Sequence, residues 1–138
     1  MISLKQLDDG GMGLEGKDSG KGSFIHSAVN YNVPVTTTAV CLLNVGRAVV
    51  VDSIIGRTFV AGTGGAATAT IFKAPSGTAP ASGTALHSGT FNLVGTIHTD
   101  QSLTLTTTAV AAGEAIWAVF TGTATSAIGE ISVNARPV

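Results

Sequence analysis

The chain has 138 residues, of which 44% are hydrophobic and 11% are charged, and its formal net charge is −1. This length fits one domain with a core of its own. The near-neutral balance argues against nucleic acid as a partner, and the longest apolar stretches, 48–51 and 115–120, are too short to cross a membrane.

The single cysteine, Cys41, excludes a disulfide within the chain and fits synthesis in a reducing cytoplasm. Because Cys41 stands between Val40 and Leu42, we expect it to be a small buried hydrophobe. The first nine residues, MISLKQLDD, lack the basic and apolar regions of a secretory signal.

Residues 1–22 differ in character from the rest of the chain. They hold seven of the fifteen charged residues and six of the eighteen glycines, a density of glycine that disfavours a helix. We interpret them as a flexible arm that precedes a body at 23–138, and the alternative is a terminus without a role. The residues expected to contact a partner are the isolated apolar ones, Leu4, Leu7, Met12 and Leu14.

From Phe24 onward, the hydrophobic pattern has a period of two residues, which is typical of β-strands. In chain order, the expected strands lie within 35–43, 47–60, 66–73, 91–97, 101–108, 115–120 and 129–135, with at most one helical turn at 84–87. Short segments rich in glycine, proline and asparagine separate them. The sequence therefore predicts an all-β fold, a single antiparallel β-sandwich and most simply a jelly roll.

Two of these strands are apolar on both faces. In 115–120, Trp117 and Val119 alternate with a second apolar set, and 49–55 is interrupted only by Asp52 and Ser53. A strand of this kind is not half solvated, so one of its faces is expected to pack on another subunit. We therefore predict a subunit interface at Trp117, Val119, Asp52 and Arg57, and we expect Asp52 with Arg57 to make either a structural pair or an interface contact. The alternative for Trp117 is a place in the core.

The sequence contains no recognised catalytic or metal-binding motif. His26, His87 and His98 are far apart, and a carboxylate pair such as Glu114 with Glu130 is not singled out by any neighbouring residue. We therefore expect no enzyme activity, cofactor or metal. The threonine-rich strands could present hydroxyls to a sugar, although threonine on an exposed strand face is also ordinary β-propensity.

Residues 80–96 and 111–123 resemble segments of small structural proteins of tailed bacteriophages, many of which are head decoration, or cement, proteins. Glu114 and His87 depart from the pattern of these segments. The resemblance implies a β-sandwich or jelly-roll body with an extended arm, trimers that bridge neighbouring major capsid proteins, synthesis in the host bacterial cytoplasm, and a place on the outer capsid surface of the virion. The alternative is a receptor- or carbohydrate-binding module of a phage tail or fibre.

Overall fold

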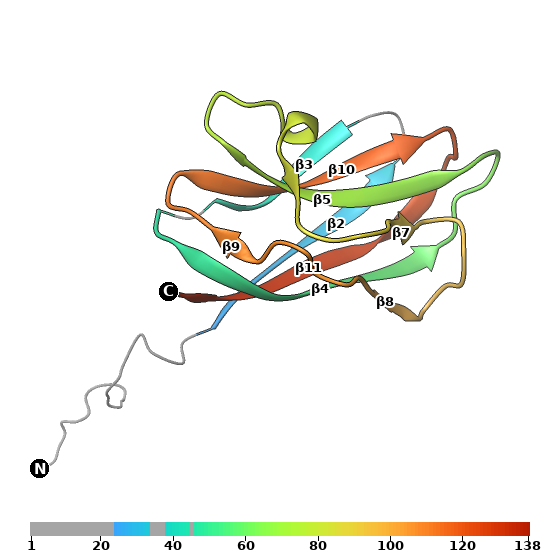
Figure 1. Cartoon of the computed structure of the whole chain (residues 1–138). Coiled ribbons are helices and arrows are strands. Elements are labelled where there is room, and N and C mark those ends of the chain that lie inside the picture. The colour runs from blue at the N-terminus through green and yellow to red at the C-terminus, as the bar shows by residue number, and fades with distance from the viewer. Residues whose placement is uncertain (1–23, 34–37, 45) are drawn as a thin grey trace, which may run out of the picture.

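The computed structural model describes residues 24–33, 38–44 and 46–138. The predicted arm, with Leu4, Leu7, Met12 and Leu14, lies outside the described residues. The described chain forms two antiparallel sheets that face each other, which confirms the predicted β-sandwich (Figure 1).

Each sheet is named here by a central strand. The β10 sheet contains, in spatial order, β3 (Thr38–Asn44), β10 (Glu114–Gly122), β5 (Ala67–Pro75) and two short strands that both pair with β5, β6 (Thr84–Ala85) and β7 (Phe91–Asn92). The β11 sheet contains β2 (Ile25–Val33), β11 (Ala127–Pro137), β4 (Val49–Val60) and two short strands that both pair with β4, β8 (Asp100–Ser102) and β9 (Ala109–Val110).

The strand order is that of a jelly roll. When β6 with β7 and β8 with β9 are each counted as one position, the described residues form eight strand positions. The β10 sheet then takes positions 2-7-4-5 and the β11 sheet takes positions 1-8-3-6, which is the double-sheet arrangement of jelly rolls. Backbone hydrogen bonds from Ser88 to Thr104 and from Thr106 to Leu86 join positions five and six, which are outermost positions of the two sheets.

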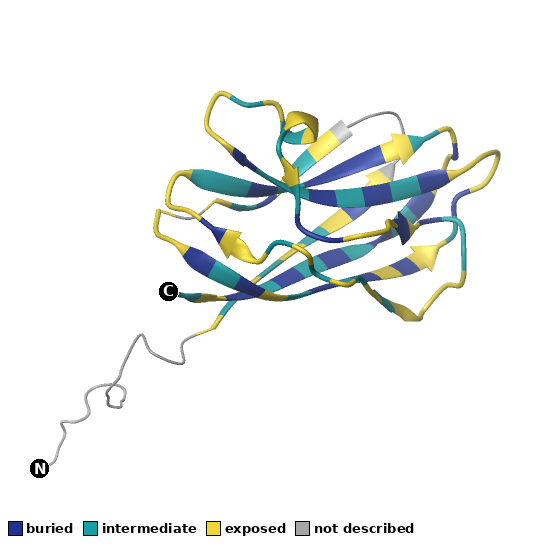
Figure 2. Ribbon diagram, viewed as in Figure 1, coloured by how far each residue is buried: buried dark blue, intermediate teal, exposed yellow. Residues whose placement is uncertain are grey.

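The core lies between the two sheets and follows the alternation of the strands (Figure 2). In β11, every second residue from Ala127 to Ala135 is buried. In β10, the inward set is Ile116, Ala118 and Phe120. Their burial, together with that of Phe91, Ile54, Ile71 and Leu86, removes apolar surface from water and provides the main stabilising term.

A close contact beside the core requires glycine at position 129. Gly129 is the cross-strand neighbour of Tyr31, and a Cβ at this position would lie 2.4 Å from the tyrosine hydroxyl oxygen and 2.4 Å from the carbonyl oxygen of Arg57. Because glycine leaves this space open, the tyrosine hydroxyl reaches the buried hydroxyl of Thr58, with 3.1 Å between the two oxygens. The tyrosine ring also packs edge to face against Phe120.

Two bulges in β4 change which side of the strand faces the core. The register with β11 shifts where Asp52 and Phe59 have no partner, so each of these is an extra residue. After the first bulge, Ile54 points inward together with Val49 and Val51, although strict alternation would separate them. Strict alternation through 49–55 is therefore wrong at Ile54, although Val50 and Ile55 on the outer side still leave this part of β4 with apolar residues on both faces.

Two local predictions were also wrong. Residues 84–87 form no helical turn, because Thr84 and Ala85 pair with Lys73 and Phe72 as β6, and the 3-10 turn η1 precedes them at Pro80–Ser82. Of the strand expected at 91–97, Phe91 and Asn92 alone form β7; the chain then turns, and Ile97 is 42% exposed instead of lying with Phe91.

Candidate interaction surfaces

The outer face of the β10 sheet is the first candidate surface. Its central row runs across all four strand positions through Cys41, Trp117, Phe72 and Ala85, which are cross-strand neighbours in the register. All four point away from the core, because residues beside them such as Ile116, Ile71 and Leu86 are fully buried. Trp117 and Phe72 are partly exposed and Cys41 is exposed.

Two further rows extend this surface, which we call the neutral face. One row contains Ala39, Val119 and Thr70, and the other contains Thr121, Thr68 and Asn92. None of these described residues carries a charge. Trp117 and Val119 thus lie on the same outer side of the β10 sheet, where Trp117 is partly exposed and Val119 is only 6% exposed, and the alternative of a core tryptophan is wrong. The expectation that Cys41 is buried is also wrong, since Cys41 points outward on a strand at the margin of the sheet.

A hollow of about 240 Å³ lies beside Trp117 at one end of the neutral face. Two turns with glycine at positive φ, Gly77 and Gly113, form part of its wall. The remaining lining is uncharged and combines apolar groups with an amide and two hydroxyls: Asn44, Ala74, Pro75, Ser76, Thr78, Ala115 and Trp117. The hollow therefore offers an aromatic ring beside neutral hydrogen-bonding groups.

The outer face of the β11 sheet, which we call the charged face, has the opposite character. Five of the eight charged residues that follow the arm lie on it, namely Asp52, Arg57, Asp100, Glu130 and Arg136. Nε of Arg57 is 2.7 Å from Oδ1 of Asp100, and Nε of Arg136 is 2.9 Å from Oδ1 of Asp52. The Arg57 guanidinium, by hydrogen bonding, holds the pKa of the Asp100 carboxyl below its ordinary value.

The predicted pair between Asp52 and Arg57 is wrong. Five residues along a strand place the two side chains roughly 15 Å apart, and each meets an opposite charge on another strand instead. These two residues also lie on the face opposite to Trp117 and Val119, so the four predicted interface residues do not form one continuous surface.

A hollow with a volume of about 360 Å³ lies on the charged face, among its polar side chains. Glu130, Arg57 and Asp100 are neighbours in one row across β11, β4 and β8. A second row is hydrogen-bonded: Asn134 Oδ1 lies 2.8 Å from His26 Nδ1, and Asn134 Nδ2 donates to Ser53 Oγ at 3.0 Å. The hydrogen-bonding groups of His26, Asn134 and Ser53 are therefore paired with one another across the strands.

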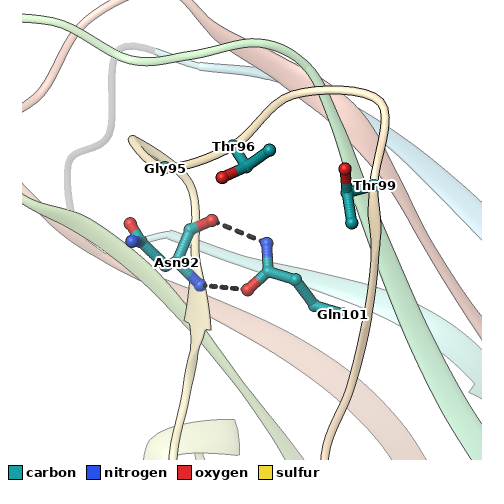
Figure 3. A pocket seen from close by; sticks show the side chains of 5 residues that line it. All are labelled: Asn92, Gly95, Thr96, Thr99 and Gln101. Atoms are coloured by element: carbon teal, nitrogen blue, oxygen red, sulfur yellow. Dashed lines mark hydrogen bonds between the residues drawn. The ribbon is translucent and has the colours of Figure 1, made fainter.

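A third hollow, of about 250 Å³, is shown in Figure 3. The Gln101 amide accepts a hydrogen bond from the backbone N–H of Asn92 at 2.9 Å and donates one to the Asn92 carbonyl at 2.8 Å, as a neighbouring strand would. Asn92 Oδ1 accepts from the N–H of Val94, and Gly95 leaves room for the Asn92 amide. Because these groups already hold the β7–β8 loop, we assign this hollow a structural role.

The three histidines are not brought together, and the described residues contain no group of metal-ligating side chains. His26 and His98 are exposed, and His98 has a positive φ of 58°. Glu114 lies in the β10 sheet, where Lys73 Nζ is 3.3 Å from its carboxylate, whereas Glu130 is on the charged face, so the two acids do not form a pair.

His87 has a structural role that the sequence did not predict. It is 5% exposed, and its Nε2 accepts a hydrogen bond from the backbone N–H of Ile71 at 2.9 Å, while Nδ1 lies 3.2 Å from the Ser88 carbonyl oxygen. The imidazole thus replaces a strand carbonyl in the gap between β6 and β7. Burial lowers the pKa of His87, and backbone hydrogen bonding at Ser88 and Gly89 opposes this effect.

Comparison with protein-family models gives no match, and comparison with curated proteins gives none. Among solved structures, a similar chain comes from the structure of the Gx strain of infectious bursal disease virus, at 14% identity and a TM-score of 0.27, covering 83% of this chain and 31% of that chain. This chain thus spans less than a third of that chain's length, and a likeness of this degree carries no argument about function. None of the described elements is a helix long and apolar enough to cross a membrane.

Proposed function

We propose that the protein is a structural component of a virion, which decorates and stabilises a bacteriophage capsid as trimers that bridge neighbouring major capsid proteins on the outer surface. The observation that carries this proposal is the separation of a neutral face with Trp117 at its centre from a charged face on the opposite sheet. An isolated small domain usually distributes charge over its whole surface, whereas an assembly component can leave one side uncharged for contact.

The resemblance of residues 80–96 and 111–123 to phage decoration proteins supports the same function. In this proposal, residues 1–22 bind the capsid through Leu4, Leu7, Met12 and Leu14, and the body makes the subunit contacts. An arm of that length spans up to about 70 Å when extended, which suits contacts distributed over neighbouring capsomers. The proposal includes no catalysis, cofactor, nucleic acid or membrane.

The test is co-sedimentation of the full chain with capsids of its parent phage that lack the protein, combined with light scattering of the free protein. We expect a trimer that saturates a fixed number of capsid sites and raises the temperature at which the capsids rupture. Deletion of residues 1–22 should leave the oligomer unchanged and weaken capsid binding. A folded full-length protein that does not sediment with capsids would contradict the proposal.

A carbohydrate-binding module of a tail or fibre is the second candidate, and the hollow beside Trp117 is the observation that favours it. An aromatic ring can stack on the apolar face of a sugar while neutral amide and hydroxyl groups bind its hydroxyls. Trp117 is the single tryptophan of the chain, so its fluorescence reports occupancy directly. Saturable fluorescence changes with host cell-surface glycans, without capsid binding, would favour this candidate.

A further inference from the structure

We propose that three copies of the chain assemble with their neutral faces turned toward a common threefold axis, so that the β3 side of one copy meets the β6 side of the next. The occupant of the neutral face is thus another copy of this chain. The threefold order rests on the proposed decoration function, whereas the choice of face rests on the charge, the register and the dimensions of the β10 sheet.

Charge distribution selects the face. Covering the neutral face buries no ionised group among the described residues, so no charge loses its hydration. Covering the charged face would desolvate Glu130 and two ion pairs that are now partly in water. The threonine hydroxyls of the neutral face can still bond to one another or to trapped water. A second copy therefore fits the neutral face without an unpaired charge.

The dimensions of the sheet suit a threefold arrangement. Strands lie about 4.8 Å apart, so the four strand positions, counted with half a spacing beyond each margin, give the face a width of roughly 19 Å. Three faces of that width enclose a triangle in which each face lies about 5.5 Å from the axis. This is close to half of the roughly 10 Å that separates packed sheets, so one layer of side chains from each face fills the interior.

The sizes of the side chains along the central row fit the space that this arrangement gives each of them. Trp117 and Phe72, on the inner strands β10 and β5, lie nearest to the axis and supply the largest apolar surface. Cys41 and Ala85 are small residues at the two margins, where the sheets of neighbouring copies meet. Cyclic contacts of this kind are heterologous, since one margin of a copy contacts the other margin of the next.

Another exposed apolar group, at the end of β4, is a poorer fit for a second copy. Phe59, Val60 and Ile97 are 37%, 46% and 42% exposed. Phe59 lines the same hollow as the paired Arg57 and Asp100, however, and the backbone N–H of His98, next to Ile97, donates to the Thr58 carbonyl. A partner covering them would also cover that pair. We therefore assign the subunit contact to the neutral face.

The experiment uses the full chain with Ala85→Cys and a short bismaleimide crosslinker. Cys41 and position 85 of one copy are roughly 14 Å apart, three strand spacings, so a shorter linker joins them only between copies. We expect a covalent trimer on denaturing gels and crosslinked peptides that join Cys41 to position 85. The wild type, with one thiol per copy, can link at most two copies. Links through Cys41 alone, or a trimer without the expected link, would overturn the proposal.

A charge placed on each face provides an independent test by light scattering. We expect Trp117→Arg, and the milder Thr70→Arg, to reduce the oligomer to the 13.7 kDa chain, while Ile55→Arg on the charged face leaves it intact. Circular dichroism confirms that each variant is folded. A monomer produced by Ile55→Arg, or an intact trimer of folded Thr70→Arg, would contradict the choice of face.

The two proposals can fail separately. If the neutral faces assemble as described but the trimer does not sediment with capsids, the decoration function is wrong and the interface stands. If the trimer binds capsids but is crosslinked through other residues, the function stands and the interface is wrong.

Discussion

We expect the His87→Leu variant to be less stable than the wild type near pH 7.5 and less sensitive to acid. Leucine fills a similar space but offers no acceptor to the backbone N–H of Ile71, which now bonds to Nε2 at 2.9 Å. An unpaired buried donor costs about 1–3 kcal/mol. The free energy of unfolding should therefore fall by about that amount at neutral pH, with the loss centred on the gap between β6 and β7.

The pH dependence follows from the neutral imidazole. Burial lowers the pKa of folded His87 below the ordinary value near 6.5, so the unfolded chain takes up a proton first. If both ring nitrogens carried a proton, Nε2 could no longer accept the hydrogen bond from the N–H of Ile71. The stability contributed by His87 is thus fully present above about pH 6.5 and decreases as the pH falls toward the lower folded pKa. One proton limits the slope to about 1.4 kcal/mol per pH unit.

The assay is urea denaturation followed by Trp117 fluorescence between pH 7.5 and 5. Asp100 and Glu114, whose pKa values are held low in the folded protein, add little pH dependence in this window, because their unfolded carboxyls take up protons mainly near and below the ordinary values of 3.8 and 4.5. His98→Asn is the matched control, because it removes an exposed imidazole with a residue that tolerates positive φ. If His87→Leu loses as much stability between pH 7.5 and 5 as the wild type does, the reasoning is refuted.

Three other predictions concern the fold and the surface. Gly129→Ala should cost about 1–3 kcal/mol in thermal or urea unfolding, since its Cβ would meet Tyr31 and the Arg57 carbonyl, whereas Gly46→Ala, with open space around it, should change stability by less than about 0.5 kcal/mol. Cys41 should react with a maleimide in the dilute native protein nearly as fast as in urea; protection at high protein concentration alone would indicate coverage by another copy. Glu114→Gln should destabilise the protein by about 0.5–1 kcal/mol at pH 7 through loss of the Lys73 pair. The pKa of Glu114 is held low chiefly by the Ala111 N–H. This difference should therefore begin to shrink as the pH falls below the ordinary value of 4.5 and disappear once the pH is below the lower folded pKa; a difference that persists after the folded carboxylate has taken up its proton would contradict the ionic origin.

The sandwich could be predicted because the pleat of a strand imposes a period of two on burial. Residues 129–135 alternate in the sequence as they do in the structure, where Gly129, Ile131, Val133 and Ala135 face the core. The same reasoning identified Trp117 and Val119 as the second apolar set of their strand. It did not tell which of the two sets faces inward, since both are apolar and the choice depends on strands far away in the chain.

The errors have the same physical origin. The bulge at Asp52 moves the inward side of β4 by one residue, and a bulge depends on the register with β11, which no local pattern reveals. The partners of Asp52 and Arg57 are 84 and 43 residues away, so the short spacing between these two residues was misleading. Cys41 has apolar neighbours on both sides, and its exposure follows from its outward direction on a strand at the sheet margin.

The composition of the neutral face suits the proposed assembly, in which each free copy must stay in solution before it meets the others. A face of leucine and phenylalanine would bind more strongly but would also associate without specificity. Thr68, Thr70 and Thr121 keep hydroxyls in water while the free copy diffuses, and their methyl groups can still pack when the face is covered. The gain per copy is consequently modest, and Trp117 supplies a large part of it. The proposed assembly should then depend strongly on protein concentration, and the capsid binding that we propose for residues 1–22 would raise the local concentration enough to complete it.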